Sequence, residues 1–251
     1  MGMYVYTPFQ SWRQGHRVHH EISSNLHYKQ DNGQTSSPWT VQEFKNASVL
    51  NKLWYLFAFG PLSYVISRNK CLSLTLIRTT TTTLEHRYFT VVPFFNIVIL
   101  QRMYSSFKMN TCLAVWIFLM WSCDLVLLEF LSMFIMCNTG YLLFHAQHTF
   151  HGAYKRRDLA FDEYQAAMLG SSFLQIPNLL KFFTLGIEYH HIHHLNTRVP
   201  CYRLQECHET GLKHFKSVPR VSMLDLVRSL PLSLYDESKR EFRVVYNYLF
   251  V

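Results

Sequence analysis

The chain has 251 residues, of which 49% are hydrophobic and 16% aromatic, and its formal net charge is +8. This length allows one or two domains with a buried core. Because the Lys and Arg residues do not gather in one stripe, the positive charge does not indicate nucleic acid binding. The six cysteines form no C-x-x-C pair and no regular framework, so we expect them to be reduced.

The first motif in the chain is Gly15-His16-Arg17-Val18-His19-His20. If this segment is helical, its three histidines stand at positions i, i+3 and i+4 and leave one face of the helix together. Neutral imidazole is a common ligand of iron, zinc and copper. The sequence therefore predicts that His16, His19 and His20 can contribute to a metal site.

A short helix is predicted to begin at Thr40. Residues 28–40 are rich in Gln, Ser, Asn and Gly, which predicts an exposed loop before it. Thr40 and Glu43 then fit a capping box, in which each side chain accepts a hydrogen bond from the backbone N–H of the other residue.

An interrupted apolar run follows between Leu53 and Ile66. Gly60-Pro61 divides it, so each half is shorter than a membrane span. We expect this run to lie at the membrane interface, with a re-entrant or full span as the alternative. Residues 67–87 are polar, and the Thr79–Thr83 tract is typical of a connecting loop.

The middle of the chain predicts a membrane hairpin. Residues 111–147 contain two acidic residues and no Lys or Arg, which is typical of membrane-spanning sequence, although a buried hairpin of a soluble protein is the alternative. We expect a span from Tyr88 to Tyr104, an outer loop from Ser105 to Asn110 and a return span that begins near Thr111. Residues 88–136 thus form two spans, and the return helix continues out of the membrane.

The basic residues predict the orientation of this hairpin. Nine Lys and Arg residues lie in residues 1–87, two in 88–144 and thirteen in 145–251. Because Lys and Arg are enriched on the cytosolic side of membrane proteins, we expect both ends of the chain to be cytosolic.

The end of the return helix carries His145, His148 and His151 toward the side of the first histidine cluster. Lys155-Arg156-Arg157 then predicts a cytosolic anchor, residues 158–169 a helix, and Ile176-Pro177 a break. The apolar run of residues 179–187 is too short to span, and we expect it to lie against the membrane.

A second cluster, Tyr189-His190-His191-Ile192-His193-His194-Leu195, repeats the spacing of the first. In a helix, His190, His193 and His194 again share one face. Two clusters that share a metal site must lie on one side of the membrane, so an even number of spans must separate them. A solvated histidine-rich surface and a zinc site are the alternatives. A zinc site closes with four ligands, whereas the two clusters with His148 supply seven, which favours two metals.

Several segments resemble the membrane fatty acid desaturases, and most closely their bacterial-type omega-6 (delta-12) acyl-lipid branch. Ser11-Trp12-Arg13, the first cluster and Ser23-Ser24-Asn25 resemble the second histidine box of that family. The other similar segments are Gln147-His148, Gly170-Ser171-Ser172-Phe173, Pro177, Tyr189 to Leu195, Arg198-Val199-Pro200 and Leu204-Gln205-Glu206-Cys207-His208.

The resemblance implies two iron ions and an O₂-dependent reaction that introduces a cis double bond into an acyl chain of a membrane lipid. It also implies an electron-transfer partner, a ferredoxin or a protein of the cytochrome b5 type. The implied iron ligands are His16, His19, His20, His148, His190, His193 and His194. His191 is expected next to these ligands, and His191, His151 and His145 are alternative ligands. His208 is expected to be a non-ligand.

The chain departs from the family pattern in two places. The family carries a first histidine box, H-D-x-x-H, which should precede residue 11 by several tens of residues and is absent here. We therefore expect the chain to correspond to the carboxy-terminal part of a desaturase. Glu188, in addition, stands where the family usually has a small residue.

The sequence as a whole predicts an all-α integral membrane protein, a transmembrane helical hairpin with a cytosolic helical cap that carries the histidine clusters. Residues 1–251 would form one desaturase-like domain, made of a cytosolic or interfacial part (1–87), the hairpin (88–144) and a cytosolic part (145–251). An inactive desaturase remnant, a related histidine-box hydroxylase or ketolase, and a zinc-binding soluble helical protein are the competing interpretations.

Overall fold

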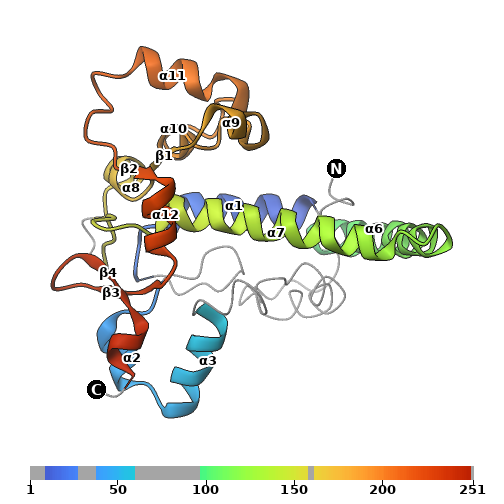
Figure 1. Ribbon diagram of the computed structural model, residues 1–251, viewed down its shortest axis with the longest axis horizontal. Helices are drawn as coiled ribbons and strands as arrows, with labels where there is room; N and C mark the ends of the chain where they lie inside the picture. Colours follow the sequence, from blue (N-terminus) through green and yellow to red (C-terminus); the bar gives the residue numbers. More distant parts are fainter. Residues whose placement is uncertain (1–8, 28–37, 60–96, 158–160, 250–251) are drawn as a thin grey trace. The chain divides into compact units, whose positions relative to one another are not determined.

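The computed structural model describes residues 9–27, 38–59, 97–157 and 161–249 (Figure 1). The predictions for residues 28–37, for the Gly60-Pro61 break, for the polar segment with the threonine tract and for most of the first span lie outside these residues. The chain divides into two compact units, one formed by Met1–Arg17 and Tyr64–Thr139, the other by Val18–Ser63 and Gly140–Val251.

The first unit contains a helical hairpin. Helix α6 (Ile97–Ser122) and helix α7 (Val126–His148) are joined by three residues, among which Asp124 has a left-handed backbone with φ of 56°. The predicted outer loop at 105–110 is therefore wrong, because these residues are helical within α6. Among the described residues, α7 is the one helix that is long and apolar enough to cross a membrane.

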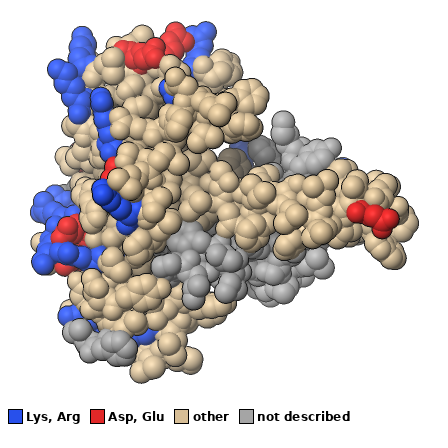
Figure 2. Space-filling view, viewed as in Figure 1, with Lys and Arg blue, Asp and Glu red and all other residues tan. Residues whose placement is uncertain are grey.

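The hairpin is held by a small interface near its turn. Met133 is buried against Trp116 and Cys137, and the indole N–H of Trp116 donates to Glu129 Oε1 at 3.0 Å. Many other large apolar side chains of the hairpin are exposed, with Leu127 70% accessible. The surface of α7 in Figure 2 is accordingly uncharged except for acidic atoms at one end. Such a surface is unusual for a protein surrounded by water.

The second unit is mostly helical and carries six of the seven predicted ligands, all except His16. Helix α1 (Phe9–Ile22) ends in this unit, as does α7. The remaining elements are α2 (Val41–Asn46), α3 (Val49–Phe59), α8 (Glu163–Leu169), β1 (Phe173–Gln175), α9 (Asn178–Thr184), α10 (His190–Leu195), the 3₁₀ helix η2 (Cys201–Arg203), α11 (Leu204–Thr210), β2 (Arg220–Ser222), α12 (Met223–Ser229), β3 (Leu232–Asp236), β4 (Glu241–Val244) and the 3₁₀ helix η3 (Val245–Tyr248).

Four short strands correct the all-α prediction. Strand β1 pairs in parallel with β2, with Leu174 opposite Val221, and β3 pairs antiparallel with β4, with Tyr235 opposite Phe242. Each of these four side chains is buried in the largest core cluster, which also includes Ala146 from α7. The two small sheets therefore anchor the end of α7 in the second unit.

The end of α1 is tied to the segment that follows α7. The N–H of Leu26 donates to Arg156 O at 2.7 Å, and the N–H of Arg156 donates to Ser24 O at 2.9 Å. Lys155 Nζ donates to Ser23 O at 2.6 Å, and burial lowers the pKa of this lysine to about 8. These bonds fix the position of α1 against the residues that follow α7.

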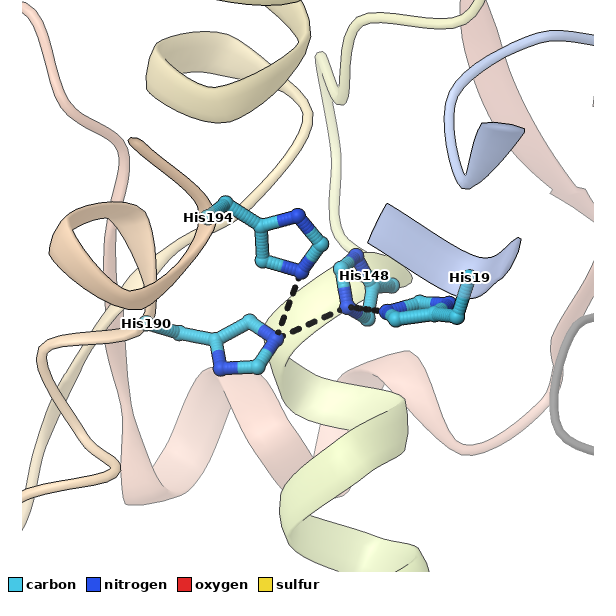
Figure 3. Close-up of side chains that lie close together, drawn as sticks. All are labelled: His19, His148, His190 and His194. Carbon is cyan, nitrogen blue, oxygen red and sulfur yellow. Dashed lines mark hydrogen bonds between the residues drawn. The ribbon is translucent and has the colours of Figure 1, made fainter. Parts of the chain in front are cut away.

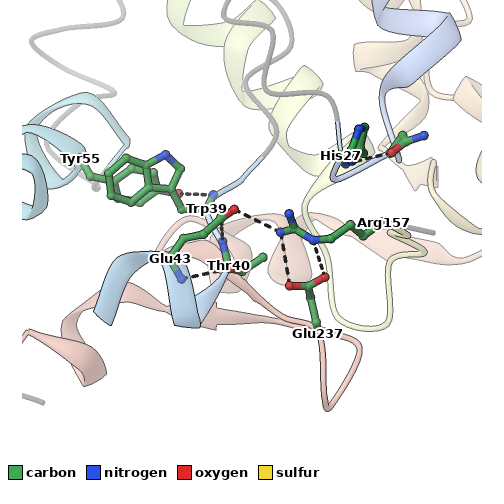
Figure 4. Close-up of polar contacts among 8 residues, drawn as sticks. His27, Trp39, Thr40, Glu43, Tyr55, Arg157 and Glu237 are labelled. Carbon is green, nitrogen blue, oxygen red and sulfur yellow. Dashed lines mark hydrogen bonds and ion pairs between the residues drawn. The ribbon is translucent and has the colours of Figure 1, made fainter. Parts of the chain in front are cut away.

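Lys155 and Arg157 of the predicted anchor therefore bind the protein itself. Arg157 pairs with Glu43 of α2 at 3.1 Å and with Glu237 at 3.0 Å (Figure 4). The predicted capping box of α2 is confirmed, since Thr40 Oγ1 accepts from the Glu43 N–H and Glu43 Oε2 accepts from the Thr40 N–H.

Tyr55 lies in a second core cluster, away from the histidines, together with Phe44, Leu234 and Val245. Its hydroxyl donates to Ser233 O at 2.6 Å and accepts from the Trp39 N–H at 3.2 Å. The variant Tyr55→Phe removes the hydroxyl that bonds to Ser233 O and to the Trp39 N–H. We therefore expect the free energy of unfolding to fall by about 1–3 kcal/mol. Denaturation of the purified protein in detergent measures this loss. An unchanged unfolding free energy would show that the hydroxyl does not stabilise the fold.

Candidate metal centre

Three helices bring histidines together in the second unit. Helix α1 ends with His19 and His20 in its last turn, and α7 ends at His148. Helix α10 begins at His190, two residues after Glu188, whose carbonyl accepts from the Leu174 N–H of β1 at 3.0 Å. The histidines of α1 and α10 thus lie at or near helix ends that backbone hydrogen bonds hold against neighbouring segments.

Four imidazoles converge in the space between these helix ends (Figure 3). His148 Nε2 lies 3.0 Å from His19 Nε2 and 2.9 Å from His190 Nε2, and His194 Nε2 lies 3.1 Å from His190 Nε2. The ligand atoms of the four residues all lie within 4.8 Å of one another. Residues 190–195 are helical, which is the condition under which the sequence placed these histidines on one face, and His190 and His194 do share a face.

These separations fit a metal ion. A metal ion lies about 2.0–2.1 Å from each imidazole nitrogen that binds it. Two such nitrogens are then about 2.9 Å apart if the angle between their bonds to the metal is 90°, and about 3.4 Å apart if that angle is tetrahedral. The observed spacings lie near the first value. His148 Nδ1 lies 3.2 Å from Gly170 O, and because a carbonyl accepts, this nitrogen must carry the proton. Its Nε2 is then the unprotonated nitrogen, as a metal ligand requires.

Burial keeps the imidazoles neutral. Loss of hydration lowers the pKa of His190 and His194 well below the ordinary value, and neighbouring histidines lower it further. Burial also lowers the pKa of His193. Neutral imidazole is the form that binds metals, so these nitrogens are available at neutral pH without loss of a proton.

A second pair of histidines lies beside this group. His20 Nε2 is 3.0 Å from His193 Nε2, and the His20 ring centroid is 4.2 Å from that of His194. His16 precedes His20 by one turn of α1, so the helix carries both residues on one face. The structure thus brings together six of the seven predicted ligands, and places His16 on the helix face that bears His20.

The three histidines predicted as alternative ligands lie elsewhere. His145 Nε2 is 2.9 Å from Ser229 O, and His151, beyond the end of α7, is exposed. His191 is fully buried, with its Nε2 2.9 Å from Nδ1 of His208. His208 was predicted as a non-ligand, and nothing in the sequence near it indicates this pairing, which depends on the packing of α11 against α10.

Glu188, the unusual acidic residue, is also buried. Its Oε2 accepts a hydrogen bond from Thr184 Oγ1, at the end of α9, at 2.7 Å. This bond offsets part of the free-energy cost of removing the carboxylate from water. The carboxylate is thereby part of the connection between α9 and α10.

Lowering the pH should destabilise the metal-free protein. Burial lowers the pKa of His191 from 6.5 to about 3, so below pH 6.5 the unfolded chain binds a proton that the folded chain does not. Stability therefore falls as the pH decreases from 6.5 toward 3, by on the order of 1 kcal/mol per pH unit for this residue. His190 and His194 act in the same direction. Denaturation in detergent between pH 6.5 and about 5 tests this, and a constant stability there would contradict the buried, neutral state of these rings.

Comparison with known proteins agrees with this arrangement. The family model described as fatty acid desaturase matches residues 1–218, which include all seven predicted ligands. A protein named fatty acid desaturase from Bacillus subtilis (strain 168) is 31% identical over 251 residues, an alignment that covers 96% of this chain and 65% of that protein. The chain thus spans slightly less than two thirds of the length of this relative. On the extent of these matches, the chain belongs to the fatty acid desaturase family.

Proposed function

We propose that this chain forms the di-iron centre of an O₂-dependent acyl-lipid desaturase of the omega-6 (delta-12) type. The observation that carries this proposal is the convergence of four imidazole Nε2 atoms from three helices, with further histidines beside them. Imidazole suits iron, and a chain that supplies seven imidazoles in two groups suits two ions better than one.

The two groups divide the ligands between two irons. His19, His148, His190 and His194 would hold one ion, and His16, His20 and His193 the other. Iron at these positions would supply the activation of O₂ and the oxidation of adjacent carbons of the acyl chain. The protein holds the imidazoles neutral and directed inward, and Phe144, whose ring centroid lies 5.0 Å from that of His19 and 5.1 Å from that of His148, limits the access of water from that side.

The same proposal places the protein in a membrane with the histidine clusters on the cytosolic face. The apolar length of α7 and the exposed side chains of the hairpin support insertion. In the second unit, Leu179, Phe182 and Phe183 of α9 and Trp54 of α3 are also largely exposed, as expected for helices that lie in the interface beside the acyl chains. A ferredoxin or a cytochrome b5 type protein would deliver the electrons.

Product analysis tests the function. The natural full-length protein is expressed in a host that lacks the corresponding desaturase, and the fatty acids of the membrane lipids are analysed by mass spectrometry. We expect an acyl product that is lighter than its precursor by two hydrogens, with a cis double bond six carbons from the methyl end. A product heavier by one oxygen would identify a hydroxylase. Unchanged lipids in the presence of reduced donor and bound iron would contradict the proposal.

A further inference from the structure

Two further buried histidines, His191 on α10 and His208 on α11, form a pair outside the metal centre. His191 follows the ligand His190 by one residue, and its Nε2 lies 2.9 Å from Nδ1 of His208 on α11. Both rings are buried, and in this contact one ring nitrogen donates its N–H to the other ring nitrogen. The bond therefore joins α10 directly to α11.

Aromatic side chains enclose this bond. The ring of His208 stacks on Phe173 with centroids 4.9 Å apart, and on Phe215 with centroids 5.8 Å apart and planes inclined by 10°. The His191 ring meets Phe215 edge to face at 5.2 Å. Because these neighbours contact the rings from several sides, each imidazole is held in one orientation, and water has no access to replace the bond between them.

Helix α10 depends on such contacts for its orientation. It has six residues, fewer than two turns, and a helix of this length is unstable without tertiary packing. Its start is fixed by the bond between Leu174 N–H and Glu188 O, which leaves rotation about the helix axis to be fixed farther along. The hydrogen bond of His191 to His208 on α11 opposes such a rotation, and so does the burial of Ile192 in a core cluster.

We infer that His208 is a positioning residue for the metal centre, which acts through its hydrogen bond to His191. By fixing the rotation of α10, it directs the imidazoles of His190, His193 and His194 toward His148 and the end of α1. This inference rests on the proposed metal-binding function and adds a residue that lies outside both histidine clusters.

The test uses three variants of the full-length protein in detergent, with Co²⁺ and Fe²⁺ as the probes. His208→Leu removes the hydrogen bond and keeps an apolar side chain among the aromatic rings. His208→Asn keeps an amide near the position of Nδ1 and so retains a partner for His191. Tyr55→Phe removes a buried hydrogen bond in the other core cluster and serves as the matched control for a general loss of stability.

We expect His208→Leu to weaken metal binding by about 10–100-fold, as is typical when a partner that orients a ligand is lost. The visible absorption of bound Co²⁺, which reports coordination geometry, should change as well. His208→Asn should restore most of the affinity and the wild-type spectrum, and Tyr55→Phe should keep both.

Three results would overturn the inference. The first is wild-type affinity and spectrum in His208→Leu. The second is metal binding in His208→Asn that is as weak as in His208→Leu. If His208→Leu does not fold, weak metal binding in His208→Asn alone would overturn the inference. The third is an equal loss in Tyr55→Phe, which would show a general stability effect. A wild-type protein that binds neither metal would instead refute the proposed function, and this inference with it.

Discussion

Replacing His148 with alanine should abolish metal binding at the four-histidine group and, with it, desaturase activity. His148 is the central residue of this group, since its Nε2 lies 3.0 Å from that of His19 and 2.9 Å from that of His190. Loss of a direct ligand should cost more than the 10- to 100-fold in affinity that is typical of an outer partner. Iron analysis of the purified variant, together with product analysis, measures the two effects.

The chain offers a matched control three residues farther along. His151 is exposed and lies beyond the end of α7, so His151→Ala should bind metal and convert substrate like the wild-type protein. If His148→Ala retained the wild-type iron content, or if His151→Ala lost it to the same degree, the assignment of His148 as the shared ligand would be wrong.

Gly170→Ala should have a comparably large effect, although residue 170 holds no metal. A Cβ at this position would lie 2.5 Å from Ala166 O and 3.1 Å from Tyr154 O, and would also collide with the side chain of Ser24. Backbone oxygens cannot move aside as a flexible side chain can, so the segment must shift. The carbonyl of Gly170 also accepts the hydrogen bond that fixes the tautomer of His148. We expect a loss of about 1–3 kcal/mol in the free energy of unfolding, together with weaker metal binding.

Gly140→Ala is the control for this substitution. A Cβ at residue 140 meets no atom within 4 Å, and alanine favours a helix over glycine by about 0.5–1 kcal/mol. This variant should therefore be as stable as the wild type or more stable, with unchanged metal binding. Equal behaviour of the two variants in denaturation and in metal titration would contradict the close approach around Gly170.

The shared face of the histidines in each cluster could be predicted for a helix because the pattern is local. The spacing of His190, His193 and His194 needs only the helical repeat, and the capping box at Thr40 needs only four consecutive residues. The break at Ile176-Pro177 is likewise local, and α9 begins at the residue after this proline.

The position of the hairpin turn could not be predicted from polarity. Residues 105–110 include four polar residues and lie between the two predicted spans, which suggested a loop, but they contain no Gly or Pro and continue α6 without interruption. The helix ends instead near Asp124, where a non-glycine residue adopts a left-handed backbone. The helical hydrogen bonds outweighed the polarity of the side chains.

Contacts between residues far apart in the chain could not be predicted either. Strands β1 and β2 have three residues each, too few to show alternation, and each exists because the other pairs with it. The role inferred for His208 has the same origin, since nothing in the sequence places α11 against α10. In both cases tertiary packing selects the structure.

The central claim is that histidines of α1, α7 and α10 hold one metal centre. Anomalous scattering at the iron absorption edge, measured on crystals of the iron-loaded protein, tests it most directly because it locates the metal without reference to activity. The account predicts a peak among the Nε2 atoms of His19, His148, His190 and His194, with a second peak beside His20 and His193. Iron bound on any other set of residues, or no peak among these histidines in crystals that contain iron, would contradict it.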